Sequence, residues 1–232
     1  MITIAEAATT LAGTPQSILC LDTCEFLDVV RGFEEDENHQ SALFHRLVDP
    51  MVSDPTKFQP VITDLVLHEW GQNLEVVRDR ASAHLLETSR RITRVVSSCG
   101  HVDIKATGPA TDFASLPVVQ GLIDLAERLM DRAMVLETDE GCIQRALSRV
   151  MDRRRPSHKG QIKDSIHLEH YLEFSRQLSQ TGFSEPILFV SGNKADFWDG
   201  PPQLHRDLRD EFAAAGLQFF GKLEAALGRL GI

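Results

Sequence analysis

Four short apolar runs stand out along the chain, separated by longer segments in which apolar and polar residues recur with helical spacing. The runs are Ser17–Asp22, which ends in an acid, Pro60–Thr63, Pro186–Val190 and Leu217–Phe220. Runs of this length that are apolar at most positions suit strands covered on both faces, as in a parallel sheet.

The segments between the runs predict helices over residues 41–48, 65–94, 118–153, 160–180 and 222–230, with a break near Gly141. Asp64 stands where it can cap the second of these helices. Residues 95–115 contain Gly and Pro and predict a loop. Strands that alternate with helices predict a three-layer α/β/α fold with a central, mostly parallel sheet, in a single domain over residues 1–232.

Four acids occupy the places where such a sheet gathers a ligand, which is outside the carboxyl ends of its strands. Asp22 ends the first run, and Asp196 follows the third run in the segment SGNKADF. Glu69 and Asp164 fall in the opening turns of predicted helices, where the helix dipole favours a negative charge. The chain has 34 acids, and any single one of them is usually a solvated charge. The evidence for a site is therefore the placement that these four acids share.

Carboxylates brought within a few ångströms of one another cannot all stay ionised unless a cation neutralises them. A site built from oxygen atoms alone selects a hard ion. If the four acids meet, the sequence predicts a site for Mg²⁺ or Mn²⁺.

Four segments, ILCLDTCEFLD, VITDLVLHEW, KGQIKDSIHLEHY and ILFVSGNKADFW, resemble the PIN-like nuclease family in order and in local character. The combination of KG-x-x-KD with S-x-NK-x-DF is most similar to a larger, poorly characterised branch of that family. The resemblance implies that Asp22, Glu69, Asp164 and Asp196 are metal ligands. It also implies that Thr23, Ser191 and Asn193 orient those ligands or a water molecule.

The resemblance covers residues 17–70 and 159–232. Residues from about 75 to 155 have no counterpart in a minimal PIN domain, so we expect a helical insertion there. One position departs from the family pattern, because Cys24 stands where an Asn or Ser is usual. A thiol is a weaker hydrogen-bond donor than an amide, which puts the positioning of water at this point in doubt.

The chemistry implied is hydrolysis of a phosphodiester by water, in which a bound cation polarises the phosphate and lowers the pKa of the water. We therefore expect a metal-dependent nuclease, with RNA favoured over DNA on the resemblance alone. Two alternatives stay open: a catalytically weak PIN-like module that binds a partner, and a small-molecule phosphatase on a similar sheet.

One basic segment precedes Asp164 in an otherwise acidic chain. Its residues, together with a lysine near Asp196, are the candidate phosphate contacts: Arg149, Arg153, Arg154, Arg155, Lys159, Lys163 and Lys194. The segment would guide a nucleic-acid strand to the acids. A solvated helix end, with arginines that complement the helix dipole, explains it equally well.

Composition and motifs exclude several other classes of protein. The net charge of -10 argues against a broadly basic nucleic-acid coat. HEWGQ lacks the second histidine of a zinc-protease motif, and no Gly-rich nucleotide loop is present. A haloacid-dehalogenase-type phosphatase would need an Asp in place of Cys24. His167 and His170 are expected to be packing or exposed residues.

The four cysteines, none in a CxxC pair, predict free thiols in a reducing cytoplasm. No signal peptide and no apolar stretch of membrane-spanning length is seen, so we expect a cytoplasmic protein without a membrane partner. The sequence is compatible with a homo-oligomer.

Overall fold

The computed structural model describes residues 1–32, 40–49, 57–101, 115–157, 162–200 and 203–232. Its centre is a five-stranded sheet in the order β3-β2-β1-β4-β5, in which every strand pair is parallel. The strands are β1 Ser17–Leu21, β2 Phe58–Thr63, β3 Met134–Leu136, β4 Ile187–Val190 and β5 Leu217–Phe220. The predicted three-layer α/β/α fold is confirmed.

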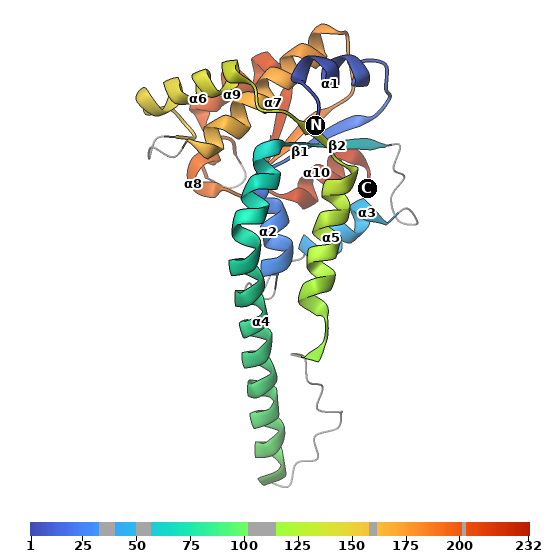
Figure 1. The fold of residues 1–232 in the computed structure, drawn as a ribbon, viewed down its shortest axis with the longest axis vertical. Helices are drawn as coiled ribbons and strands as arrows, with labels where there is room; N and C mark the ends of the chain where they lie inside the picture. The colour runs from blue at the N-terminus through green and yellow to red at the C-terminus, as the bar shows by residue number, and fades with distance from the viewer. Residues whose placement is uncertain (33–39, 50–56, 102–114, 158–161, 201–202) are drawn as a thin grey trace.

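Helices cover both faces of this sheet (Figure 1). One face carries α2 Thr23–Arg31, α3 Gln40–Val48, α4 Asp64–His101, α5 Val118–Arg132 and α10 Leu223–Leu230. The other face carries α1 Ile4–Leu11, α6 Glu140–Met151, α7 Lys163–Gln180 and α9 Arg206–Ala215, with the short α8 Lys194–Phe197.

Strand β1 explains why the core divides into two layers. Successive side chains of a strand point to opposite faces of the sheet. Leu19 and Leu21 pack among the helices of one face, whereas Ile18 and Cys20 pack among those of the other. All four are fully buried, as expected for the central strand of a parallel sheet.

The structure corrects several predicted elements. Residues 95–101, predicted as a loop, continue α4, and the rest of that loop up to residue 114 lies outside the described residues. The helix predicted over residues 118–153 is two helices separated by the edge strand β3. Three apolar residues flanked by helices carry too little periodicity to distinguish a strand from a helix. Helices α1, α2 and α9 were not predicted.

The segment expected to be a helical insertion, residues 75–155, contains most of α4 together with α5 and α6. It also supplies β3, which pairs with β2 in parallel. Among the described residues of this segment, most are helical, and Met134–Leu136 extends the central sheet.

Helix α4 is the longest element, with 38 residues. Its first half packs against α2, and its second half projects away from the sheet (Figure 1). Over the described part of the chain, no helix combines the length and the apolar character that crossing a membrane requires.

Candidate functional site

The first acid, Asp22, lies where two central strands end side by side. Leu21 of β1 pairs with Val190 of β4, so the residues after these strands, Asp22 and Ser191, are neighbours. The Ser191 hydroxyl donates to Asp22 Oδ2 at 2.6 Å, and the Thr23 amide donates to Oδ1 at 2.7 Å. Asp22 is also the N-cap of α2, where the helix dipole favours its charge.

The second acid, Glu69, lies one turn into α4, which begins directly after β2. Its Oε2 accepts from the Thr23 hydroxyl at 2.6 Å and lies 3.1 Å from His167 Nε2, and its Oε1 lies 3.2 Å from Lys163 Nζ. Burial alone would favour the neutral acid. The hydrogen bonds from His167, Thr23 and Lys163 outweigh it and lower the pKa of Glu69 to about 2.

The third acid, Asp164, is the second residue of α7. Two turns further along this helix, the buried Tyr171 hydroxyl donates to the carbonyl of Leu21 at 2.7 Å. This bond ties α7 to the end of β1. It therefore brings the start of α7 to the same edge of the sheet as Asp22.

The surroundings of Asp164 disfavour the ionisation of its carboxyl group. Burial is the main cause, and the negative charges of Asp22 and Asp196 add to it, so that the pKa rises to about 7. A hydrogen bond from Asn193 and the charge of His167 act in the opposite direction and compensate only in part. The smaller part of this rise, which comes from Asp22 and Asp196, is the electrostatic repulsion expected of carboxylates gathered at one site.

The fourth acid, Asp196, is buried within α8, which follows β4 and has Asn193 as its N-cap. Asp22, Glu69 and Asp164 line one cavity of about 380 Å³ at the carboxyl edge of the sheet. A neighbouring cavity is lined by Glu69 and Asp164 as well. Among the described residues, neither lining includes Asp196. Its charge nevertheless acts on Asp164.

The predicted orienting residues have distinct partners. Thr23 contacts Glu69 and Ser191 contacts Asp22, while Asn193 bonds to Asp164. Each of the three acids that line the cavity is thus held by one of the residues for which the resemblance implied an orienting role.

The donor set has the chemistry of a hard-cation site, because the cavity is lined by carboxylate and amide oxygen atoms. The geometry does not close a ligand shell, however. In the described ranges, no three His, Cys, Asp or Glu side chains are arranged so that they could hold one ion together. Both oxygens of Glu69 already accept from donors. The side chains therefore match a divalent cation in chemical type but not in the spacing that they have here, and Glu69 would also have to exchange Lys163 for the ion.

Cys24 occupies the position where the sequence departs from the family pattern, and it lines the cavity. Its Sγ lies 3.4 Å from Asp22 Oδ2 and 3.8 Å from the Ser191 hydroxyl. Burial is the main cause that raises the pKa of this thiol well above its usual value, and the charges of Asp22, Glu25 and Asp28 raise it further. The group is therefore a neutral thiol that donates weakly to Asp22.

His167 belongs to the site, although a packing role was expected for it. Its Nδ1 lies 2.9 Å from the Thr63 hydroxyl, and its Nε2 carries the hydrogen that Glu69 accepts, because a carboxylate only accepts. The signal available in the sequence was its spacing. Residues three apart on a helix share a face, and His167 follows Asp164 by three. For His170 the packing role is found, because its Nδ1 lies 2.8 Å from the carbonyl of Ile166.

Two arginines of the basic segment, Arg149 and Arg154, belong to a network of ion pairs with carboxylates of α7 and α9. Arg149 is buried between Glu169 of α7 and Glu211 of α9 and bonds to both. Arg154 pairs with Glu211 at 2.7 Å, and Arg155 donates to the carbonyl of Ala195. The guanidinium of Arg149 is enclosed by carboxylates, an arrangement that favours a structural role for it over contact with a phosphate.

The other predicted phosphate contacts differ in their exposure and in the groups that they already contact. Lys163 is half-exposed at the rim of the acidic cavity, where it pairs with Glu69. Lys194 lies over the ring of Trp198, 5.7 Å from its centre. Arg153 is exposed on the surface, and Lys159 lies outside the described residues.

Glu25 is a buried acid beside the cavity that sequence reasoning missed. Its Oε1 accepts from the Gly192 amide at 2.8 Å, and its Oε2 accepts from the Gln40 side chain. Burial is the main cause that raises its pKa to about 8. The charges of Asp28 and Asp22 add to this rise, and the bonds from Gln40 and Gly192 oppose it.

This raised pKa predicts a loss of stability at alkaline pH. In the metal-free protein, the native state keeps the Glu25 proton up to about pH 8, whereas the unfolded chain releases it near pH 4.5. The free energy of unfolding should therefore fall with rising pH between these values, by at most about 1.4 kcal/mol per unit for one proton. Glu25→Gln should weaken this dependence in urea titrations made in EDTA. An unchanged slope would contradict the raised pKa.

A parallel sheet with acids collected at its carboxyl edge places the chain among the α/β proteins that bind charged ligands at that edge. A sequence model of the PIN domain matches residues 19–197, a span that contains all four acids. The chain belongs to the PIN domain family, whose members are generally metal-dependent nucleases. No curated protein and no solved structure matches it.

Proposed function

We propose that this protein is a nuclease that hydrolyses phosphodiester bonds of nucleic acid with the help of Mg²⁺ or Mn²⁺. The observation that carries the proposal is the position of Asp22, Glu69 and Asp164 in the lining of one cavity, although they come from three separate parts of the chain. The raised pKa of Asp164 supports it, because a divalent cation would relieve the repulsion that raises it. RNA is proposed as the preferred substrate on the family resemblance.

In this proposal Asp22, Glu69 and Asp164 would move closer together to hold the cation, and Asp196 would add negative charge that acts on Asp164. When bound, the ion would supply Lewis-acid polarisation of the phosphate and a water of lowered pKa. Thr23 and His167 keep Glu69 ionised and oriented, and Ser191 does the same for Asp22. Lys163, released from Glu69, would be placed at the rim to neutralise a phosphate oxygen.

The first test is cleavage by the purified full-length chain. Labelled single-stranded RNA and DNA of the same sequence, and their duplexes, are incubated with Mn²⁺, with Mg²⁺ or with EDTA. We expect cleavage with either metal and none in EDTA, and faster cleavage of RNA than of DNA. Release of phosphate from a nitrophenyl monoester without cleavage of any nucleic acid would favour a phosphatase instead.

A catalytically weak binding module is the second candidate. The specific observation in its favour is that Glu69 is already neutralised by Lys163 and His167, without a cation. Titration of the protein with Mn²⁺ by calorimetry separates the two. Binding that is lost in the Asp164→Asn variant supports the nuclease, whereas absence of binding together with absence of cleavage supports the module.

A further inference from the structure

We define the arm of α4 as residues 74–101, a stretch that begins against the body of the protein, where Val77, Ala81 and Leu85 are buried, and ends in the half of the helix that projects beyond it (Figure 1). It carries five arginines and three carboxylates, a formal excess of two positive charges in a chain whose net charge is -10. Its residues are mostly exposed, apart from a row that includes Val77, Ala81 and Leu85. A projecting, electropositive helix on an acidic protein is a local attraction for a polyanion.

The arginines of the arm are aligned with the acidic cavity. An α-helix turns about 100° per residue, so Glu69, Asn73, Arg80, Arg91 and Arg94 fall within roughly 60° of one another around the axis of α4. The first two of these residues line the cavity. We call Arg80, Arg91 and Arg94 the arm stripe. It continues, along the same side of the helix, the face that α4 presents to the site.

The cavity itself extends toward the arm. Besides Asp22 and Asp164 at the edge of the sheet, its lining includes Asn73, two turns into α4, and Arg31, the last residue of α2. Helices α2 and α4 pack against each other. The hollow therefore runs from the acids along both helices, and the arm stripe begins about two further turns beyond Asn73 along α4.

The side chains of the stripe are available to a ligand. The side chains of Arg91 and Arg94 are 73% and 70% exposed, and both share the single carboxylate of Glu87. Exposed ion pairs of this kind contribute at most about 1 kcal/mol, so a phosphate can displace Glu87. Within the described residues, Arg80 forms no ion pair.

We infer that the arm stripe binds the phosphate backbone of a nucleic-acid strand whose scissile bond lies in the acidic cavity. This inference rests on the proposed nuclease function and names its substrate as a chain long enough to reach the arm. Arg80 and Arg94 lie about 16 Å and about 38 Å from Glu69 along the helix, at 1.5 Å per residue. A stacked strand, with about 3.4 Å per nucleotide, needs roughly 5 and 11 nucleotides to span these distances.

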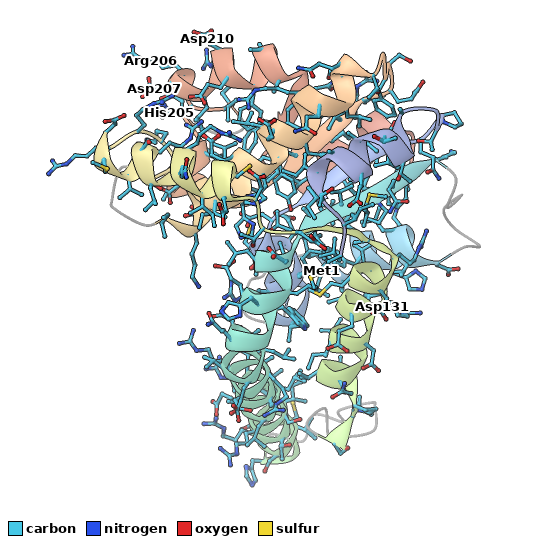
Figure 2. All side chains as sticks on the ribbon, turned by 45° about the horizontal axis from the view of Figure 1, so that its top comes forward. Met1, Asp131, His205, Arg206, Asp207 and Asp210 are labelled. Carbon is cyan, nitrogen blue, oxygen red and sulfur yellow. The ribbon has the colours of Figure 1, made fainter. Side chains whose placement is uncertain are left out.

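The test compares two variants with the same change in net charge. Arg80→Glu/Arg91→Glu/Arg94→Glu alters the stripe, and Arg206→Glu/Arg209→Glu/Arg229→Glu alters three exposed arginines away from the arm. Figure 2 labels Arg206 at the end of the molecule opposite the arm. Binding of labelled RNA of 6 and 24 nucleotides is measured by fluorescence anisotropy in EDTA, where a metal-dependent enzyme does not cleave, after circular dichroism shows that both variants are folded.

For the 24-nucleotide RNA we expect the stripe variant to bind at least about 10-fold more weakly and the control variant to change by less than about threefold. The slope of log K against log salt should fall by about 2 for three lost phosphate contacts on a single strand. The 6-nucleotide RNA can reach Arg80 but neither Arg91 nor Arg94, so the stripe variant should weaken its binding less than that of the 24-nucleotide RNA. Glu87→Gln, which frees Arg91 and Arg94, should tighten binding of the longer RNA.

Equal weakening by the stripe variant and the control variant would overturn the inference, because the effect would then come from net charge. Unchanged RNA binding together with a change in the mass measured by light scattering would assign the arm to contacts between protein copies and overturn it as well. Cleavage by the wild type with no effect of the stripe leaves the nuclease proposal intact. Length-dependent binding without any cleavage would contradict the proposed nuclease function but not the binding of nucleic acid by the arm stripe.

Discussion

Replacing Asp164 with asparagine is expected to lower Mn²⁺-dependent cleavage by at least about 1000-fold, a change of about 4 kcal/mol in the activation free energy. The substitution keeps the size of the side chain and an oxygen that can accept from Asn193, but it removes the charge that would hold a cation in the cavity. Asp22→Asn should act in the same way, since Asp22 lines the same cavity.

The same variant should be more stable than the wild type when no metal is present. The pKa of Asp164 is raised to about 7 by burial and by the charges of Asp22 and Asp196. A carboxyl group with a raised pKa loses its contribution to stability as the pH increases from about 4 to about 7, and the loss is complete above that range. At pH 8 in EDTA, Asp164→Asn should therefore unfold at a higher temperature than the wild type, and the difference should vanish below pH 4.

Asp131→Asn provides the matched control, because it makes the same chemical change on the exposed surface of α5 (Figure 2). It should leave both cleavage and the unfolding temperature unchanged. Cleavage within tenfold of the wild type in Asp164→Asn would show that the reaction occurs elsewhere. A lower unfolding temperature in EDTA would show that Asp164 is not under repulsion.

Replacing Arg149 with alanine is expected to lower the free energy of unfolding by about 3–5 kcal/mol, the usual cost of removing one partner of a buried ion pair. Arg149 on α6 contacts Glu169 on α7 and Glu211 on α9, and it also donates to the carbonyl of Arg155 at 3.0 Å. Its loss leaves Glu169, which is buried, with only the exposed end of Arg145 as a counter-charge. Urea unfolding followed by circular dichroism measures the change.

Arg154→Ala is the control in the same segment, because Arg154 is half-exposed and pairs only with Glu211 among the described residues. It should cost less than about 1 kcal/mol. The double variant Arg149→Met/Glu169→Gln should regain part of the lost stability, since it removes the buried charge along with its partner. If Arg149→Ala unfolds like the wild type and instead loses affinity for RNA, the residue is a phosphate contact, as the sequence first suggested.

The basic segment shows how far charge in a sequence can be interpreted. A row of arginines before Asp164 is equally consistent with a nucleic-acid track and with a structural network. Which of the two applies depends on where Glu169 and Glu211 lie, and these residues are 20 and 62 positions away from Arg149. Only the packing of α6 against α7 and α9 brings the three charges together.

The strands and the acids were accessible to prediction for a local reason. A buried parallel strand must be apolar at nearly every position, so β1, β2, β4 and β5 are visible as runs. Because ligands bind at the carboxyl ends of such strands, the acids that follow the runs could be singled out. Asp22 and Asp164 do share a cavity with Glu69. Strand β3 was not predicted, because three residues at the edge of a sheet do not form such an apolar run.

The sequence by itself determined the class of fold and the family, and it singled out three acids that line one cavity, because each of these depends on runs, spacings and motifs within short segments. The tertiary structure decided how the acids are held, which arginines are enclosed and which are available. It paired Glu69 with His167 and Lys163 and buried Arg149. It also brought Arg31 of α2 and Asn73 of α4 into the lining of one cavity. These outcomes depend on contacts between residues far apart in the chain, and the free energy of such contacts is set by burial and distance, which no local pattern specifies.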